Sequence, residues 1–255
     1  MAVSIDAYLT PFFHEHESLF EDSAVVMIDV FRASTTVAVA LMNGAREVIP
    51  VETLEKAVKI YNSLSKEVRF LGGERNCLKP SGFDAGNSPL DYTKDNVYGK
   101  SVILTTTNGT RIFQKAKQAR SRIVGSFVNL NAVIEYLTGQ IENSDDNLKI
   151  IFMCAGNDDR LSYEDILCAG AFISALESIY SDNYISDPAM AAMSLYKQHS
   201  KELSAFLKQR EHALKLSHLG FEQDIELCLS FDICPVIPLI EGSSIKKYEN
   251  KTIYI

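Results

Sequence analysis

The chain has 255 residues, 46% of them hydrophobic, and a formal net charge of −8. A chain of this length and composition can bury one large core. The acidic balance argues against nucleic acid as the main partner, because phosphate backbones are held by surfaces rich in Lys and Arg. Any anion that the protein binds must therefore be captured by a local group of residues.

The spacing of the cysteines and the character of the first residues indicate the cellular compartment of the protein. The five cysteines are spread along the chain without a C-x-x-C pair, so the sequence predicts neither a disulfide framework nor a zinc knuckle. The first residues show no basic stretch followed by an apolar one, and no apolar run approaches the roughly 18 residues that a membrane span needs. We expect a cytoplasmic protein without membrane association.

Short apolar runs rich in β-branched residues alternate with helical patterns, as is typical of parallel strands joined by crossover helices. Strands are predicted at 24–29, 46–51, 68–71, 101–106, 122–126, 149–154, 235–240 and 251–255. Helices are predicted at about 33–43, 52–65, 108–118, 129–140 and 162–180, and the region 187–229 is predicted to be mostly helical. The predicted class is α/β, with three layers (α/β/α) around a largely parallel sheet and a helical C-terminal region.

The predicted elements contain an internal recurrence. The order strand-helix-strand-helix-strand of residues 24–72 returns over residues 101–155, with REVIPVETLEKAV opposite SRIVGSFVNLNAV. We interpret this as two duplicated halves within a single α/β domain, residues 1–255. The connector 72–99 between them is long and rich in Gly and Asn. Loops of that length inside a compact domain are usually functional or disordered, and the scarcity of Lys and Glu runs argues against disorder.

Polar segments follow most of the predicted strands. In open parallel sheets, ligands collect at the carboxyl ends of the strands, where each strand passes into a helix. The segments at those points are DVFRASTT (29–36), GGER (72–75), TTTNGTR (105–111), GSFVN (125–129) and CAGNDDRLSYED (154–165). We therefore expect the functional site at this edge of the sheet.

The segment TTTNGTR combines hydroxyl groups with a flexible Asn-Gly pair and the start of a helix. A helix start presents unpaired amide hydrogens at a positive dipole end, and together with hydroxyls these can cradle an oxyanion. An arginine in the first turn would add a bidentate contact. Ordinary helix capping by Thr107 or Asn108 is the alternative. The predicted substrate-binding residues of this segment are Thr105, Thr106, Thr107, Asn108, Gly109, Thr110 and Arg111.

Two acidic residues stand at strand ends. Asp29 ends a fully apolar strand, where a buried carboxylate is costly unless it binds a metal, pairs with a cation or takes part in catalysis. Arg32 would be its partner in a structural pair or a second contact for the anion. Glu74 and Arg75 directly follow another strand, so this pair could hold a divalent cation together with the anion that the cation neutralises. Asn87 supplies a further oxygen, although turn formation also explains it.

The segment CAGNDDR has two competing interpretations. Cys154 and Arg160 match the C-x5-R spacing of cysteine-dependent phosphatases, in which a thiolate attacks phosphorus. Asp158 and Asp159 would place negative charge inside that phosphate cradle, which favours a packed core thiol instead. Downstream, Glu164 and Asp165 lie in the first turn of the next predicted helix, where acids suit the helix dipole and could also bind a metal.

Taken together, DVFRAST, LGGERNCLKPSGFDAGNSPLDYT, GKSVILTTTNGTR, GSFVNLNAV and CAGNDDRLSYEDILCAGA resemble the 2-phosphosulfolactate phosphatase family in order and spacing, over about residues 22–180. The resemblance implies a Mg²⁺-dependent phosphatase that converts 2-phospho-3-sulfolactate into 3-sulfolactate and phosphate, a step toward coenzyme M. Family members often carry a Ser-x-His-Gly element near the C-terminus, where this chain has Arg-Glu-His-Ala around His212. The resemblance thus makes His212 a candidate catalytic residue.

The sequence predicts metal-assisted hydrolysis of a small phosphorylated sulfonate or carboxylate by a cytoplasmic enzyme, with a homodimer as a further expectation. Phe31 stands two residues after Asp29, where aspartate-based phosphatases usually have a second Asp, which favours direct attack by water. The predicted catalytic residues are Asp29, Arg32, Glu74, Arg75 and His212. The predicted Mg²⁺ ligands are Asp29, Glu74 and Asp165, and the predicted substrate contacts outside residues 105–111 are Asn87 and Ser126.

Two other functions stay open at this point. A cysteine hydrolase of isochorismatase type would use Cys154 at a strand end as its nucleophile. A non-catalytic module would bind a phosphorylated or sulfonated metabolite without turnover. Replacement of Cys154 by Ala and a phosphate-release assay separate the three functions.

Overall fold

Ten strands form one mixed sheet in the computed structural model, which describes residues 3–11, 17–143, 148–180 and 183–249. The strands are β1 (Ser4–Tyr8), β2 (Ser23–Ile28), β3 (Glu47–Pro50), β4 (Arg69–Gly73), β5 (Ser101–Thr105), β6 (Ser121–Gly125), β7 (Lys149–Cys154), β8 (Tyr184–Ile185), β9 (Pro238–Glu241) and β10 (Ser244–Lys247). The α-helices are α1 (Ala33–Met42), α2 (Leu54–Ser63), α3 (Lys94–Val97), α4 (Gly109–Ile112), α5 (Leu130–Glu142), α6 (Tyr163–Ile179), α7 (Asp187–His199), α8 (Leu203–Leu207), α9 (Glu211–His218) and α10 (Glu222–Cys228).

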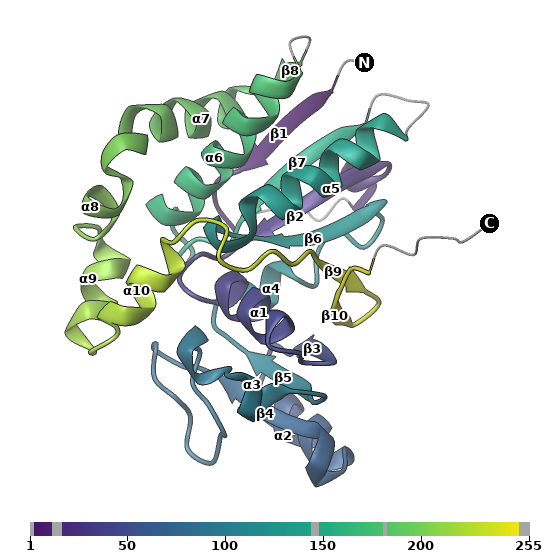
Figure 1. Ribbon diagram of the computed structural model, residues 1–255, viewed down its shortest axis with the longest axis vertical. Coiled ribbons are helices and arrows are strands. Elements are labelled where there is room, and N and C mark those ends of the chain that lie inside the picture. Colours follow the sequence, from purple (N-terminus) through teal and green to yellow (C-terminus); the bar gives the residue numbers. More distant parts are fainter. Residues whose placement is uncertain (1–2, 12–16, 144–147, 181–182, 250–255) are drawn as a thin grey trace.

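The central strand β2 shows why the fold has three layers. Successive side chains of a strand point to opposite faces of the sheet. Val26 and Ile28 pack in the core shared with α5 and α6, whereas Val25 and Met27 pack in the core shared with α1. Every residue of β2 is buried, as expected for a strand that is covered on both faces. The predicted α/β class is confirmed (Figure 1).

The sheet consists of two parallel groups joined by a hairpin. Its order is β4-β5-β3-β10-β9-β6-β2-β7-β1-β8. Pairing is parallel within β4-β5-β3 and within β6-β2-β7-β1-β8. The β9–β10 hairpin pairs antiparallel with β6 on one side and with β3 on the other. The sheet is therefore largely parallel, as predicted, with an antiparallel centre that the sequence did not indicate.

The two recurring segments interlock in the sheet. Strand β2, the first of residues 24–72, lies between β6 and β7 of the second segment, and β5, the first of residues 101–155, lies between β3 and β4 of the first. The registers correspond as well, since Val25 is opposite Arg122 and Ser101 is opposite Glu47. This is the same correspondence that places REVIPV opposite SRIVGS in the sequence. In the sheet, the first strand of each segment thus pairs with strands of the other segment.

The predicted helix 108–118 is wrong in length. Only Gly109–Ile112 is helical, and Ala116 beyond it has a left-handed backbone, which does not continue a helix. Up to residue 180, the other predicted elements begin and end within two residues of the observed ones. Strands β1, β8 and β10 were not predicted, and the predicted strand 251–255 lies outside the described residues.

The helical C-terminal region matches the prediction for residues 187–229. Helix α7 begins at Ser186, whose hydroxyl accepts a hydrogen bond from the Ala189 amide, with a proline in the first turn. From α7 to α10 the chain runs along one side of the molecule and returns to the central strands (Figure 1). No helix in the described part of the chain has the length and apolar character needed to cross a bilayer.

Candidate active site

A polar cavity of about 40 Å³ lies where the carboxyl ends of β2, β4, β5 and β7 meet helix α9. It is lined by residues that follow these strands and by three residues of α9: Asp29, Phe31, Arg32, Glu74, Asn76, Cys77, Asn87, Thr106, Thr107, Asn108, Asn157, Asp158, His212, Lys215 and Leu216. Four of the five strand ends singled out in the sequence thus share one cavity, and the segment 125–129 does not reach it.

Asp29 lies at the centre of this arrangement. It is buried, and its Oδ1 accepts a hydrogen bond from the Ala33 amide at 3.2 Å. A Cβ atom at Gly109 would lie 2.6 Å from Asp29 Oδ2 and 2.5 Å from the Ala33 Cβ, so only glycine lets α4 approach this closely. Burial raises the pKa of Asp29 to about 6, and the neighbouring carboxylates of Glu74 and Glu164 act in the same direction against His212.

Glu74 ties two strand ends together. Its Oε1 accepts a hydrogen bond from the Thr107 amide at 2.7 Å, and its Oε2 accepts one from the Cys77 amide at 2.8 Å. The neighbouring Arg75 does not line the cavity. Its guanidinium donates to the carbonyls of Glu74 and Glu52 and to the Thr105 hydroxyl. Arg75 therefore braces the ends of β4 and β5, while Glu74 lines the cavity.

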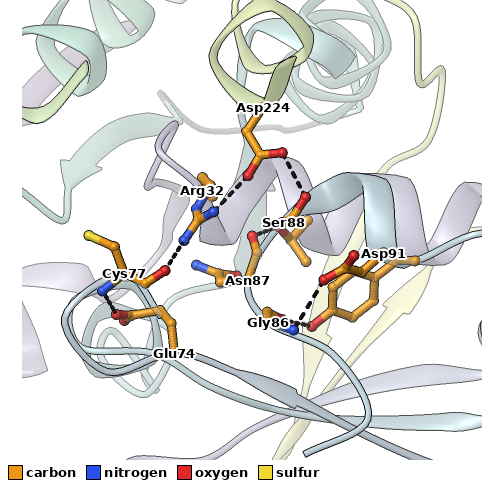
Figure 2. A network of polar contacts seen from close by, with 10 residues as sticks. Arg32, Glu74, Cys77, Gly86, Asn87, Ser88, Asp91 and Asp224 are labelled. Atoms are coloured by element: carbon orange, nitrogen blue, oxygen red, sulfur yellow. Dashed lines mark hydrogen bonds and ion pairs between the residues drawn. The ribbon is translucent and has the colours of Figure 1, made fainter. Parts of the chain in front are cut away.

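Arg32 lines the cavity, but its guanidinium is held by other groups (Figure 2). It donates to Asp224 Oδ2 at 2.6 Å and to the Cys77 carbonyl at 2.8 Å, and it stacks on the ring of Phe221 at 4.3 Å. The other oxygen of Asp224 accepts from the Ser88 hydroxyl at 2.6 Å. The alternative of a structural ion pair between Asp29 and Arg32 is thus wrong. Arg32 pairs with Asp224 instead, which the sequence did not indicate.

His212 is held in the cavity by Glu164, which the sequence indicated as a candidate metal ligand and not as a partner of the histidine. Its Nδ1 lies 2.7 Å from Glu164 Oε1, and its ring meets Phe31 edge-on. Burial lowers the pKa of His212, but hydrogen bonds with Cys77 and Glu164 outweigh burial and raise the pKa to about 10. The imidazole is therefore protonated at neutral pH, and it brings a positive charge to a cavity lined by three carboxylates, those of Asp29, Glu74 and Asp158.

Several predicted site residues lie outside the cavity. Arg111 pairs with Asp159 at 2.8 Å on the exposed surface. Thr110 donates to Thr106 through both its amide and its hydroxyl, so capping in this segment is made by Thr106. Ser126 caps its own helical turn and lies 3.2 Å from the Thr35 hydroxyl. The predicted substrate contacts that line the cavity are Asn87, Thr106, Thr107 and Asn108, whereas Thr105, Gly109, Thr110, Arg111 and Ser126 do not.

Asp165, the third predicted metal ligand, is also outside the cavity. Its Oδ1 accepts from the Val30 amide at 2.8 Å and its Oδ2 from the Gly156 amide at 3.0 Å. Burial raises the pKa of Asp165 well above its usual range, as do Glu164 and Asp29. These bonds hold the ends of β2 and β7 in place, which is a supporting function for the cavity wall.

The cavity offers oxygen ligands that fit a magnesium ion. Asp29 and Glu74 line it, and the Asn87 Oδ1 atom is buried without a hydrogen-bond partner in the described residues (Figure 2). Among these residues, no group of three or more His, Cys, Asp and Glu side chains is arranged to bind a metal. Mg²⁺ commonly takes only one or two carboxylates and completes its shell with water and phosphate oxygens. The fit is therefore to Mg²⁺ with an incomplete protein shell.

Two similar loops supply cavity residues that sequence reasoning missed. In loop 75–78 and in loop 157–160, the outer residues exchange backbone hydrogen bonds and the two middle residues are left-handed. Asn76 and Asp158 occupy corresponding positions in the two loops, and both line the cavity. The recurrence of residues 24–72 in 101–155 was the signal that could have found them. Lys215 lies three residues after His212 on α9, which is the spacing of one helix face.

Cys154 is fully buried at the end of β7. Burial raises the pKa of its thiol well above the usual range, with Asp165 and Glu164 adding to the effect. A thiol in this state is not the thiolate that cysteine hydrolases and cysteine phosphatases use. The residue packs in the core instead.

The family model described as 2-phosphosulpholactate phosphatase matches residues 8–243. The chain belongs to this family. A protein of Thermotoga maritima is 41% identical over 228 residues, which is 89% of this chain and 93% of that protein, and one of Caldanaerobacter subterraneus subsp. tengcongensis is 37% identical over 226 residues, or 89% and 91%. Both carry the name "Probable 2-phosphosulfolactate phosphatase". The resemblance seen in the sequence is confirmed, as is the enzyme class, phosphoric monoester hydrolase.

Proposed function

We propose that the protein hydrolyses 2-phospho-3-sulfolactate to 3-sulfolactate and phosphate and that it requires Mg²⁺. The observation that carries the proposal is the cavity in which the carboxylates of Asp29 and Glu74 lie close to the protonated His212. The names of the relatives support the substrate, and the oxygen ligands support the metal. The alternatives of a cysteine hydrolase and of a binding module without turnover have no support from the relatives.

Asp29, Glu74 and Asn87 would hold the metal. Bound there, Mg²⁺ would polarise the phosphoryl oxygens and lower the pKa of a water molecule. The pKa of Asp29 is raised mainly by burial and further by the carboxylates of Glu74 and Glu164, and a cation at this place would offset both effects. The hydrogen bonds from the Thr107 and Cys77 amides would keep the Glu74 carboxylate in position.

The end of β5 would bind the phosphoryl group. Thr106, Thr107 and Asn108 line the cavity there and offer hydroxyl and amide groups that suit phosphate oxygens. Lys215 of α9 would add a positive charge from the opposite wall. It lies 3.8 Å from Asp158, a separation at which the lysine can still turn toward a phosphate.

His212 would assist departure of the sulfolactate oxygen. Its ring is protonated and oriented by Glu164, which is the arrangement of a general acid that gives a proton to a leaving alkoxide. The high pKa slows proton donation but keeps the positive charge in place across the neutral range. His212 would thus stabilise developing negative charge as well as supply the proton.

Phosphate release from 2-phospho-3-sulfolactate tests the proposal. We expect turnover with Mg²⁺, loss of turnover in EDTA, and recovery when Mg²⁺ is restored. Cys154→Ala should retain activity, because its thiol is packed in the core. No release under any metal condition would leave the binding module as the better account, and a Cys154→Ala variant that folds but is inactive would favour the cysteine hydrolase.

A further inference from the structure

A second and larger cavity adjoins the candidate active site. Its volume is about 640 Å³, against about 40 Å³ for the first. The two cavities share His212, Asn157 and Asp158 as wall residues. The second one extends from there along the start of α6 and the turn that precedes α9. A molecule bound with one end in the first cavity therefore has room for its other end in the second.

The volumes of the two cavities indicate which end of a phosphate ester each cavity would hold. The first cavity has room for little more than the phosphoryl group and a few water molecules. The organic part of the substrate must then pass His212, which lies between the two cavities. The second cavity therefore determines which organic part the enzyme accepts.

Two arginines in the second cavity have no acidic partner. Arg210 stacks on the ring of Phe206 at 4.6 Å, and its Nε is buried without a hydrogen-bond partner in the described residues. Arg160 lines the cavity with an exposed side chain. Neither guanidinium forms an ion pair within residues 3–11, 17–143, 148–180 and 183–249. A buried donor without a partner is unfavourable, so an anion at Arg210 would relieve a cost already present.

The acidic residues of the second cavity do not cancel these charges. Glu164 is engaged by His212 at 2.7 Å, and Asp158 lies 3.8 Å from Lys215. Glu211 is the remaining carboxylate on the wall, and it is exposed in the first turn of α9. Two arginines against one exposed carboxylate leave the cavity suited to an oxyanion that accepts paired hydrogen bonds, as sulfonates and carboxylates do.

We propose that the second cavity binds the sulfonate end of the substrate and that Arg210, assisted by Arg160, determines specificity for it. This inference rests on the proposed function, because it concerns the part of the same substrate that does not react. The arginines would hold the organic part in place without contact with the phosphorus. Their loss should therefore weaken substrate binding and leave the chemical step largely intact.

The kinetic test compares Arg210→Gln and Arg160→Gln with Arg46→Gln, which removes an exposed positive charge at the start of β3. For 2-phospho-3-sulfolactate we expect Arg210→Gln to raise KM about tenfold or more, as loss of a charge-assisted hydrogen bond does, with kcat changed by less than about threefold. For p-nitrophenyl phosphate, which lacks a sulfonate, kcat/KM should stay within about twofold of wild type. Arg46→Gln should change neither substrate's constants.

A binding measurement keeps the two proposals separable. Calorimetry with 3-sulfolactate and with lactate, which lacks the sulfonate, should show binding of sulfolactate to the wild type and loss of that preference in Arg210→Gln. If Arg210→Gln fails to fold, Arg160→Gln tests the same cavity, because Arg160 is an exposed residue. Phosphate release by the wild type decides the proposed function. An enzyme that hydrolyses the substrate but keeps its KM and its sulfolactate binding in both variants would overturn the inference alone.

Discussion

Loops 75–78 and 157–160 have the same backbone and opposite surroundings. Each follows the third strand of its half, closes by two backbone hydrogen bonds and has two left-handed residues in the middle. Loop 75–78 is packed against buried charges: its Cys77 carbonyl accepts from Arg32, which pairs with Asp224 (Figure 2). Loop 157–160 is exposed, and its two aspartates pair with cations on the surface.

The two segments, the first and the second copy, share the backbone conformation of these loops. They differ in the side chains that they bring to the cavity. The first copy contributes the carboxylates of Asp29 and Glu74, and the second contributes the hydroxyl and amide groups of Thr106, Thr107 and Asn108. A cation site needs the first set and a phosphate site needs the second. Because the copies exchange their first strands, both sets reach one cavity. The first of the following predictions alters one copy and uses the other as its control.

The largest effect is expected for Asp29→Asn, which removes charge from the first copy. Asparagine keeps an oxygen for the Ala33 amide but binds Mg²⁺ weakly, so kcat/KM should fall by about a hundredfold or more. The raised pKa of Asp29 means that the native state loses stability as pH rises from the ordinary value of 3.8 to about 6. Asp29→Asn should therefore raise the melting temperature at pH 7 in EDTA.

Kinetics with varied Mg²⁺ and thermal unfolding in EDTA check the two parts of this prediction. Asp159→Asn is the matched control, because it removes a carboxylate from the exposed loop of the second copy. That variant should change kcat/KM by less than about threefold, as surface changes away from the site usually do. An Asp29→Asn enzyme with wild-type turnover would show that the first copy does not supply the metal site.

Among the ion pairs compared here, the buried pair of Arg32 and Asp224 should contribute most to the free energy of unfolding. Asp224→Asn leaves the guanidinium of Arg32 buried, at 2% side-chain exposure, without its counter-charge. Breaking such a pair costs about 3–5 kcal/mol in the free energy of unfolding. Urea unfolding measures this, and Glu226→Gln on the same helix, an exposed partner of Lys208, should change it by less than about 1 kcal/mol. Equal losses of unfolding free energy in Asp224→Asn and Glu226→Gln would show that the buried pair of Arg32 contributes no more than the exposed pair.

His212 should make the stability of the protein depend on pH. Its pKa is raised from the ordinary 6.5 to about 10, so its contribution is fully present below pH 6.5 and is lost as pH rises toward and through 10. His212→Asn should thus be most destabilising relative to wild type near pH 6 and least near pH 10.5. Urea unfolding at several pH values gives this difference. Glu164→Gln, which removes the partner, should reproduce the trend, and a pH-independent difference would refute the pairing.

The local part of the fold and site could be predicted from sequence. Apolar runs and the polar segments after them marked the strand ends, and the rule that parallel strands present these ends together accounts for Glu74 and Thr106, which follow the paired strands β4 and β5. Asp29 follows β2, in the group that the β9–β10 hairpin sets antiparallel to them, so the rule alone does not explain its place in the same cavity. Arg111 was predicted to contact the anion because it lies in the first turn of the helix that follows the strand. It does lie in that turn, but its side chain pairs with Asp159 on the surface instead.

The long-range part could not be predicted, because contacts between distant segments leave no periodic pattern. Asp224 is 192 residues from Arg32, and Glu164 is 48 residues from His212. The exchange of first strands between the two halves is likewise a choice of pairing partner, and both pairings are compatible with the same apolar runs. Both loops line the same cavity although β4 and β7, which they follow, are not neighbours in the sheet.

The smallest effect is expected for the surface pair of the second copy. Arg111 and Asp159 lie 2.8 Å apart with more than half of each side chain exposed. Exposed pairs of this kind contribute roughly 0.2–1 kcal/mol, and salt screens them. A double-mutant cycle of Arg111→Ala and Asp159→Ala, followed by urea unfolding in low and high salt, should give a coupling energy in that range that shrinks with salt. A coupling energy between Arg111 and Asp159 as large as the unfolding free energy lost in Asp224→Asn would contradict this prediction. Loops 157–160 and 75–78 would then be held with equal strength and would differ only in exposure. The expected small value implies that loop 157–160, which forms part of both cavities, opens more readily than loop 75–78.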